Sequence, residues 1–157
     1  MLTLMVMILF LWGCDREILT PDIQLDASTD CKGFELKAAL DVPQNEDCIA
    51  WRFSDNQLII KHINTGFNCC PEGFDVNLAV KGDTLIISES EHSAMCDCNC
   101  LYDLEYTLTG IEKGTWWIRV VEPYIRSSED EPILFEVNFR KDTSGQVCYT
   151  RNFYPWN

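Results

Sequence analysis

A chain of 157 residues is the size of one small domain, large enough to bury a hydrophobic core. Its apolar fraction of 46% is typical of a folded globular protein and argues against wholesale disorder. The 12 basic and 25 acidic residues give a net charge of −13, which repels nucleic-acid phosphates and anionic lipid head groups. Composition therefore excludes a nucleic-acid partner.

The chain opens with an apolar leader. Residues 1–12 are apolar except Thr3, and this segment is shorter than the roughly 20 residues that a helix needs to span a bilayer. An apolar run of this length that ends at a small residue, here Gly13, is typical of a signal peptide. We therefore expect residues 1–13 to be removed on export.

The end of the leader, Leu11-Trp12-Gly13-Cys14, resembles the lipobox of bacterial lipoproteins. The resemblance implies that Cys14 becomes the new N-terminus and carries acyl chains such as palmitate, which anchor it in the lipid bilayer. Residues 14–30 would then be a tether. The implied location is the bacterial cell envelope, anchored at the outer membrane and facing the periplasm or the surface. The alternative is an ordinary secretory leader that ends near a cysteine.

Eight of the nine cysteines follow Cys14. In an exported chain an even number predicts a set of disulfides, here up to four. These cysteines are Cys31, Cys48, Cys69, Cys70, Cys96, Cys98, Cys100 and Cys148.

The alternative for the cysteines is a metal site. Its ligands would be Cys69, Cys70, Cys96, Cys98 and Cys100, with His62 or His92. On a strand, however, alternate residues lie about 7 Å apart, too far for the sulfurs of one zinc ion. We therefore expect disulfides, with no bound metal and no cofactor.

Polar and apolar residues alternate with a period of two through most of the chain, and no long amphipathic helix is evident. The expected strands are 34–40, 49–53, 58–63, 74–80, 84–90, 102–108, 115–121, 133–139 and 146–151. Gly82-Asp83 predicts a two-residue hairpin turn. Strands with one polar face predict an all-β, immunoglobulin-like antiparallel sandwich of eight or nine strands, disulfide-stabilised, as one domain over 31–157.

The segment from Leu108 to Val120 reads Leu-Thr-Gly-Ile-Glu-Lys-Gly-Thr-Trp-Trp-Ile-Arg-Val. It resembles a hairpin of bacterial immunoglobulin-like, fibronectin-like and prealbumin-like modules, with Trp116 replacing a tyrosine. The resemblance implies a sandwich hairpin at this place.

Trp116 and Trp117 must face opposite sides of one strand. If Trp116 faces inward, then Trp117 and Arg119 face outward. An exposed Trp beside an Arg suits stacking or cation–π contact with a sugar or peptide. The alternative is that a loop or the apolar tail 153–157 covers Trp117.

Strand direction also predicts the disulfide pairing. If consecutive strands alternate in direction, six cysteines lie at one end of the sandwich, and Cys31 and Cys148 lie toward the other. We therefore predict a Cys31–Cys148 bridge and pairing of the other six among themselves. Cys69 and Cys70 should bond to different partners, because bridging adjacent residues strains the peptide.

Catalytic motifs are absent from the sequence, which contains no GxSxG, HExxH, P-loop or GxGxxG pattern. His62 lies in an apolar strand, as a hydrogen-bonded core or edge histidine does, and His92 lies in a loop. The acidic loop 127–131 lacks the alternating ligand pattern of a calcium loop and is interpreted as a solvated turn.

These patterns favour a non-enzymatic cell-envelope lipoprotein whose sandwich binds a glycan or an envelope protein. One alternative is a hydrolase or hydrolase inhibitor with a site on its loops. A second alternative is a metal carrier that uses the cysteine cluster.

Overall fold

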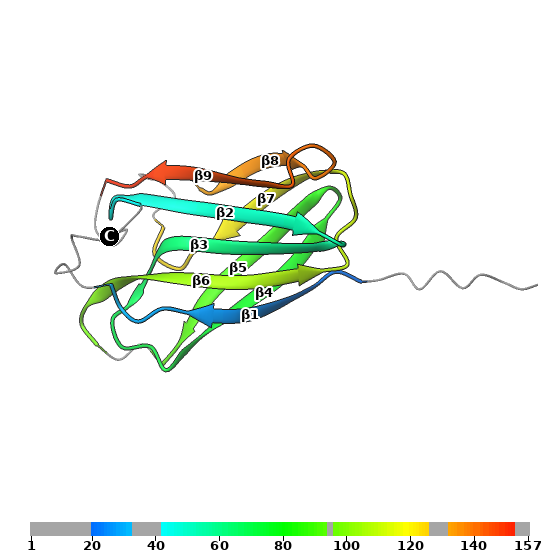
Figure 1. Ribbon diagram of the computed structural model, residues 1–157. Coiled ribbons are helices and arrows are strands. Elements are labelled where there is room, and N and C mark those ends of the chain that lie inside the picture. Colours follow the sequence, from blue (N-terminus) through cyan, green and yellow to red (C-terminus); the bar gives the residue numbers. More distant parts are fainter. Residues whose placement is uncertain (1–19, 33–41, 94–95, 126–131, 153–157) are drawn as a thin grey trace, which may run out of the picture.

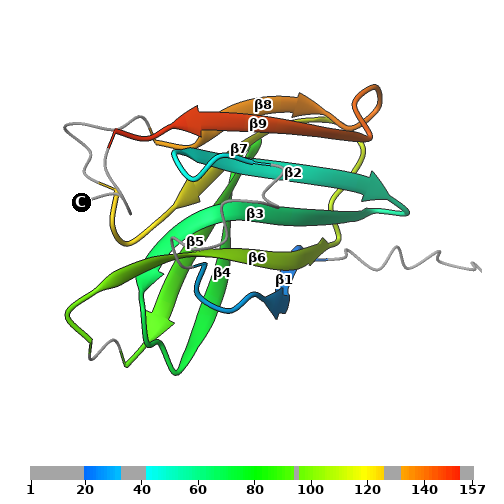
Figure 2. The ribbon, with the colours of Figure 1, turned by 60° about the vertical axis from the view of Figure 1, so that its left-hand side comes forward.

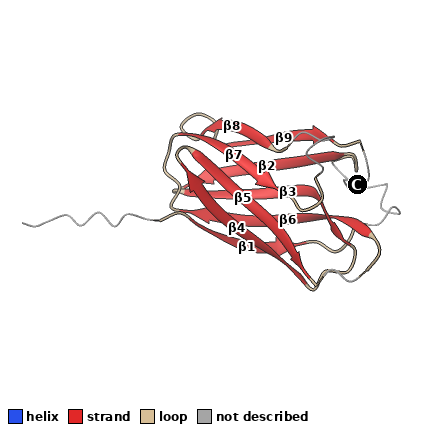
Figure 3. Cartoon of the chain, turned by 180° about the vertical axis from the view of Figure 1, so that it is seen from behind, coloured by secondary structure: helices blue, strands red, loops and turns tan. Residues whose placement is uncertain are grey.

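Nine strands and no helices make up the ordered elements in a computed structural model, which describes residues 20–32, 42–93, 96–125 and 132–152 (Figure 3). The strands are β1 (Asp22–Ser28), β2 (Glu46–Ser54), β3 (Gln57–Asn68), β4 (Gly73–Lys81), β5 (Thr84–His92), β6 (Asn99–Thr109), β7 (Thr115–Val121), β8 (Leu134–Asn138) and β9 (Ser144–Thr150). The prediction of an all-β protein is confirmed.

The strands form two sheets that pack face to face (Figures 1 and 2). One sheet has the order β1-β6-β3-β2-β9 and the other the order β4-β5-β7-β8. All neighbours are antiparallel except β5 and β7, which are parallel because β6, between them in sequence, crosses to the other sheet. The predicted sandwich is therefore present, and its four-stranded sheet is mixed rather than purely antiparallel.

Residues 22–28, which we expected within the tether, form β1 and pair with β6. Ile23 and Leu25 are half-buried and pack against the core, so this strand belongs to the sandwich. Two alternating apolar residues gave too short a pattern to distinguish a strand from a polar tether. The strand expected at 34–40 and the leader at 1–13 lie outside the described residues.

The core lies between the sheets and is built from alternate residues of each strand. Its fully buried aliphatic side chains include Leu58, Ile60, Leu85, Ile87, Leu104, Leu108 and Ile118. Phe53 and Phe139 stack with ring centroids 4.5 Å apart. Burial of each such side chain stabilises the fold by about 1.5–3 kcal/mol before the entropy of ordering is subtracted.

A bulge at Asn64 changes which residues of β3 face inward. Asn64 adopts a left-handed backbone with φ of 67°, and the pairing of β3 with β6 shifts by one residue there. As a result His62 and Thr65, three positions apart, both point between the sheets. The Asn64 side chain fixes the bulge by donating to the Glu46 carbonyl at 2.8 Å and accepting from Lys32 Nζ at 2.9 Å.

Four disulfides form, as the number of cysteines predicted, and Cys69 and Cys70 have different partners. The bridges are Cys31–Cys100, Cys48–Cys148, Cys69–Cys98 and Cys70–Cys96. The predicted Cys31–Cys148 bridge is therefore wrong, and so is the pairing of the other six only among themselves.

The pairing error has a topological cause. Because β1 precedes Cys31, that cysteine lies where β1 ends and β6 begins, and it bridges to Cys100. Cys148 stands directly opposite Cys48 in the register of β2 and β9, with their Cα atoms 4.1 Å apart. All eight cysteines thus lie toward the end of the sandwich where the odd-numbered strands finish, here called the cysteine end.

The strand β7 has the register that its sequence predicts. Trp116 packs against the core and donates its indole N–H to the Glu112 carbonyl at 2.9 Å. Trp117 is 37% exposed on the opposite face.

We expect Trp116→Ala to lower the free energy of unfolding by about 3 kcal/mol, because a large and mostly buried aromatic is removed. Trp117→Ala should cost less than about 1 kcal/mol, since its side chain lies at the surface. Urea melts of both variants measure the difference. A larger loss for Trp117→Ala would contradict the register of β7.

Candidate functional site

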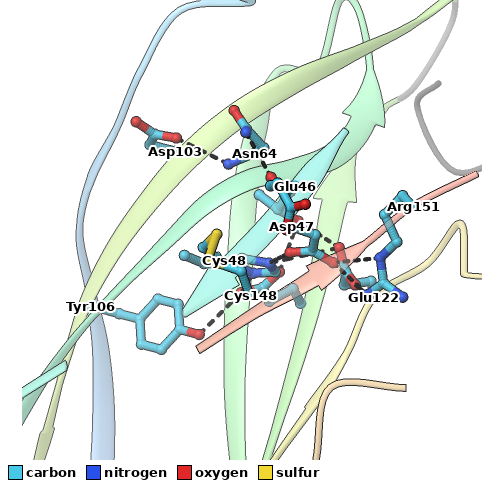
Figure 4. Close-up of polar contacts among 12 residues, drawn as sticks. Glu46, Asp47, Cys48, Asn64, Asp103, Tyr106, Glu122, Cys148 and Arg151 are labelled. Carbon is cyan, nitrogen blue, oxygen red and sulfur yellow. Dashed lines mark hydrogen bonds and ion pairs between the residues drawn. A yellow bond between two sulfur atoms is a disulfide. The ribbon is translucent and has the colours of Figure 1, made fainter. Parts of the chain in front are cut away.

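Ionisable side chains gather inside the sandwich near the cysteine end, partly shown in Figure 4. Charged side chains are rarely buried unless they have partners. A set of buried ionisable side chains therefore marks a candidate functional site. The buried cluster consists of Asp47, His62, Thr65, Glu89, Tyr106, Glu122 and Arg151. Glu89 comes from β5 and Glu122 follows β7, whereas the other members belong to or follow strands of the five-stranded sheet. The cluster therefore joins the two sheets.

His62 is at the centre of the buried cluster and is fully buried. Its Nδ1 lies 2.8 and 3.0 Å from the two carboxylate oxygens of Glu89, and its Nε2 lies 2.6 Å from Asp47 Oδ1. Burial alone lowers the pKa of His62, but the charges of Glu89 and Asp47 and their hydrogen bonds raise this pKa well above its ordinary value. Each ring nitrogen of His62 thus faces a carboxylate, an arrangement in which a protonated imidazole donates from both nitrogens.

Arg151 is the second cation of the cluster. Its Nε donates to Asp47 Oδ2 at 2.8 Å, and its Nη2 contacts the same oxygen and, at 3.2 Å, Glu122 Oε2. Burial raises the pKa of Asp47, but His62 and Arg151 outweigh this effect and hold the pKa below its ordinary value. Burial and the negative charge of Asp47 raise the pKa of Glu122 well above its ordinary value.

Glu89 is held by hydroxyl groups as well as by His62. Tyr106 and Thr65 each donate to one of its oxygens at 3.1 Å. Burial and the adjacent charge of Glu89 raise the pKa of Tyr106, so this hydroxyl remains a donor. With a proton on Glu122, two carboxylates face two cations and the cluster is neutral.

Glu122 is a member of the buried cluster that also lines a cavity. This cavity, of about 210 Å³, is lined by residues 119–122, Ile125 and Pro132. The side chains of Asp47 and His62 are 0% exposed and that of Glu122 is 1% exposed. A substrate in the cavity therefore does not contact His62.

The sequence indicated part of this arrangement. The interpretation of His62 as a hydrogen-bonded core histidine is confirmed. His92 is exposed, but it is the last residue of β5 and not a loop residue as expected, and it contacts the Asp75 carboxylate. Cys14, the acidic loop 127–131 and the tail 153–157 lie outside the described residues.

The acidic members of the cluster were missed, although a signal for them exists. Asp47 stands two residues before the buried Ile49, and so occupies the inward-facing register of β2. Glu89 and Glu122 stand two residues after buried aliphatic residues of β5 and β7. The signal was therefore a charged residue at a position where the alternation of the strand predicts an inward-facing side chain.

A second candidate site lies on the outer face of the four-stranded sheet. Cross-strand register places Trp117 beside Thr84, and Arg119 between Ile86 and Leu134. A shallow depression of about 490 Å³ follows these rows, and Trp117 and Leu134 are 37% and 44% exposed. The outer-face patch consists of Lys81, Asp83, Thr84, Ile86, Trp117, Arg119 and Leu134. The predicted outward direction of Trp117 and Arg119 is thus confirmed.

No family model, no curated protein and no solved structure matches the chain. Within the described ranges, no helix has the length and apolar character needed to cross a membrane.

We expect the domain to lose stability as the pH rises. Folding raises the pKa values of His62 and Glu122 above their ordinary values of 6.5 and 4.5. These two groups therefore stabilise the fold fully below their ordinary pKa values, and the stabilisation is lost as the pH rises through their folded pKa values. Asp47 has the opposite effect, because folding lowers its pKa. Its contribution to the free energy of unfolding is present above pH 3.8 and is lost as the pH falls through its folded pKa.

Thermal melts in chelator-containing buffer from about pH 4 to about pH 10 measure this profile. The melting temperature should be highest in mild acid and should fall in alkali. Glu122→Gln, which mimics the protonated acid, should flatten the fall, whereas His92→Gln should not. A melting temperature that rises steadily toward alkaline pH would contradict this account.

Proposed function

We propose that the protein is a non-enzymatic binding module of the bacterial cell envelope, anchored by lipid at Cys14, which binds a glycan through the outer-face patch. The lipobox-like leader supports the anchor, and the four disulfides support an oxidising compartment. The observation that carries the binding role is the exposed Trp117 next to Arg119 on a rigid sheet.

The chemistry of the patch suits a sugar ring. One face of a pyranose carries C–H groups that stack on an indole, and its edge carries hydroxyl groups. Trp117 supplies the aromatic surface, with Ile86 and Leu134 extending it. Arg119 and Asp83 supply a donor and an acceptor for hydroxyl groups at the rim.

Three further considerations favour a glycan-binding role over an envelope-protein partner, a hydrolase and a metal carrier. The depression is lined by seven residues, whereas a stable protein interface takes about 20–30 residues from each partner. The acid and base groups of the buried cluster are enclosed, and a substrate cannot contact His62. The sulfurs that a metal carrier would use are held in disulfides, and thiolates are the form that binds metal.

Removal of the indole at Trp117 should weaken glycan binding at least about tenfold, the equivalent of about 1.4 kcal/mol. The measurement is a screen of envelope and plant polysaccharides with the wild-type domain, followed by titration of any ligand with Trp117→Ala. Val121→Ala is the matched control, because Val121 is similarly exposed on the same strand and face but lies outside the depression. Equal binding by Trp117→Ala, or a wild type that binds only proteins, would contradict the glycan site.

The anchor is tested separately. Cells supplied with a palmitate label should transfer it to the wild-type protein and not to Cys14→Ala, because the thiol is the acceptor of the diacylglyceryl group. Membrane fractionation of both proteins is the second readout. Equal labelling of the two would leave a secreted domain without a lipid anchor.

A further inference from the structure

We propose that the buried cluster binds a divalent transition ion of the zinc class, with Asp47, His62 and Glu122 as its ligands. One ligand atom from each residue lies within 4.8 Å of the others, and all three residues are buried. This inference is independent of the glycan proposal, because it concerns the interior of the sandwich rather than its outer face.

Three ligand atoms converge on one point. His62 Nε2 lies 2.6 Å from Asp47 Oδ1 and 3.8 Å from Glu122 Oε1. Bonds of about 2.0–2.2 Å to nitrogen and oxygen place the ligands of a tetrahedral zinc ion about 3.3 Å apart. The ion fits between these atoms if the Asp47 carboxylate moves back by less than about 1 Å.

The surroundings of His62 match those of a metal-bound histidine. Such a histidine usually donates its other ring N–H to a carboxylate, which fixes the ring and its tautomer. Glu89 occupies this position, with both oxygens within 3.0 Å of Nδ1. Hydroxyl groups of Tyr106 and Thr65 hold Glu89 in turn. His62 Nε2 is therefore the nitrogen left to face the ion.

Arg151 leaves the ligand oxygens available. It contacts Asp47 Oδ2 and Glu122 Oε2, while Oδ1 and Oε1 of the same residues point to His62. A divalent ion would take the place of one proton on His62 and one on Glu122. Two positive charges would replace two, so the cluster would stay neutral in the interior, where an uncompensated charge is costly.

The donor set selects the class of ion. One imidazole nitrogen with carboxylate oxygens suits zinc and its neighbours in the first transition row. Calcium requires six to eight oxygen ligands, more than this cluster offers. Glu122 also lines the cavity of about 210 Å³ described above, and a path of entry is one requirement of a metal site.

The experiment uses the oxidised full-length domain with its thiol content checked, freed of metal with a chelator and then dialysed. Zinc at about a hundredfold excess over Kd should raise the melting temperature by about 5–10 °C, whereas magnesium and calcium should not. Cobalt should bind at one equivalent and give the visible absorption of a low-coordinate site. If zinc does not raise the melting temperature of the wild type and cobalt does not bind, the proposal is wrong. The buried cluster is then a network of ion pairs whose charges neutralise one another.

Two variants locate the ion. Glu122→Gln preserves the size of the side chain and its contact with Arg151, so the domain should fold while zinc affinity falls at least about tenfold. His92→Gln removes the surface histidine and should leave zinc binding unchanged. Retention of full affinity in Glu122→Gln, or its loss in His92→Gln, overturns the assignment to the buried cluster.

Discussion

The contact between His62 and Glu89 joins the two sheets through charged groups, and the cysteine end of the sandwich is built around it. The imidazole comes from β3 and the carboxylate from β5, with 2.8 Å between Nδ1 and Oε1. Loss of one partner would leave a charge buried without compensation, which typically costs about 3–5 kcal/mol. A whole domain is stable by only about 5–15 kcal/mol, so the remaining residues at this end must keep the two groups together.

Several local features serve that requirement. The bulge at Asn64 turns Thr65 inward, so that its hydroxyl reaches Glu89 at 3.1 Å. The Cys48–Cys148 disulfide joins β2 to β9 one residue after Asp47 and three residues before Arg151, which form an ion pair. Because the bridge limits relative movement of these strands, the guanidinium stays on the carboxylate that His62 also uses. Backbone irregularity and covalent cross-link thus act on the same group of charges.

The sequence predicted the strands better than their partners. Alternation placed Trp116 inward and Trp117 outward, and the Gly82-Asp83 turn joins β4 and β5 with Lys81 opposite Thr84. These features depend on local periodicity. The buried cluster depends on strand order, because β2, β3, β5 and β7 must meet in a sandwich before Asp47, His62, Glu89 and Glu122 become neighbours. The disulfides were mispaired for a related reason, since omission of β1 moved Cys31 to the wrong end.

The two candidate sites share their strands, and this sharing follows from the two-residue period of a sheet. The strand β7 presents Trp117 and Arg119 outward and leads directly into Glu122, while β5 presents Ile86 outward and Glu89 inward. The inner ion pairs therefore fix the positions of the strands whose outer faces form the outer-face patch. A shallow site gains affinity mainly by having its side chains in place before the ligand arrives, because each side chain ordered on binding costs about 0.5–1.5 kcal/mol. Charges buried on the inner side of these strands would thus supply the rigidity that the proposed glycan site on their outer side requires.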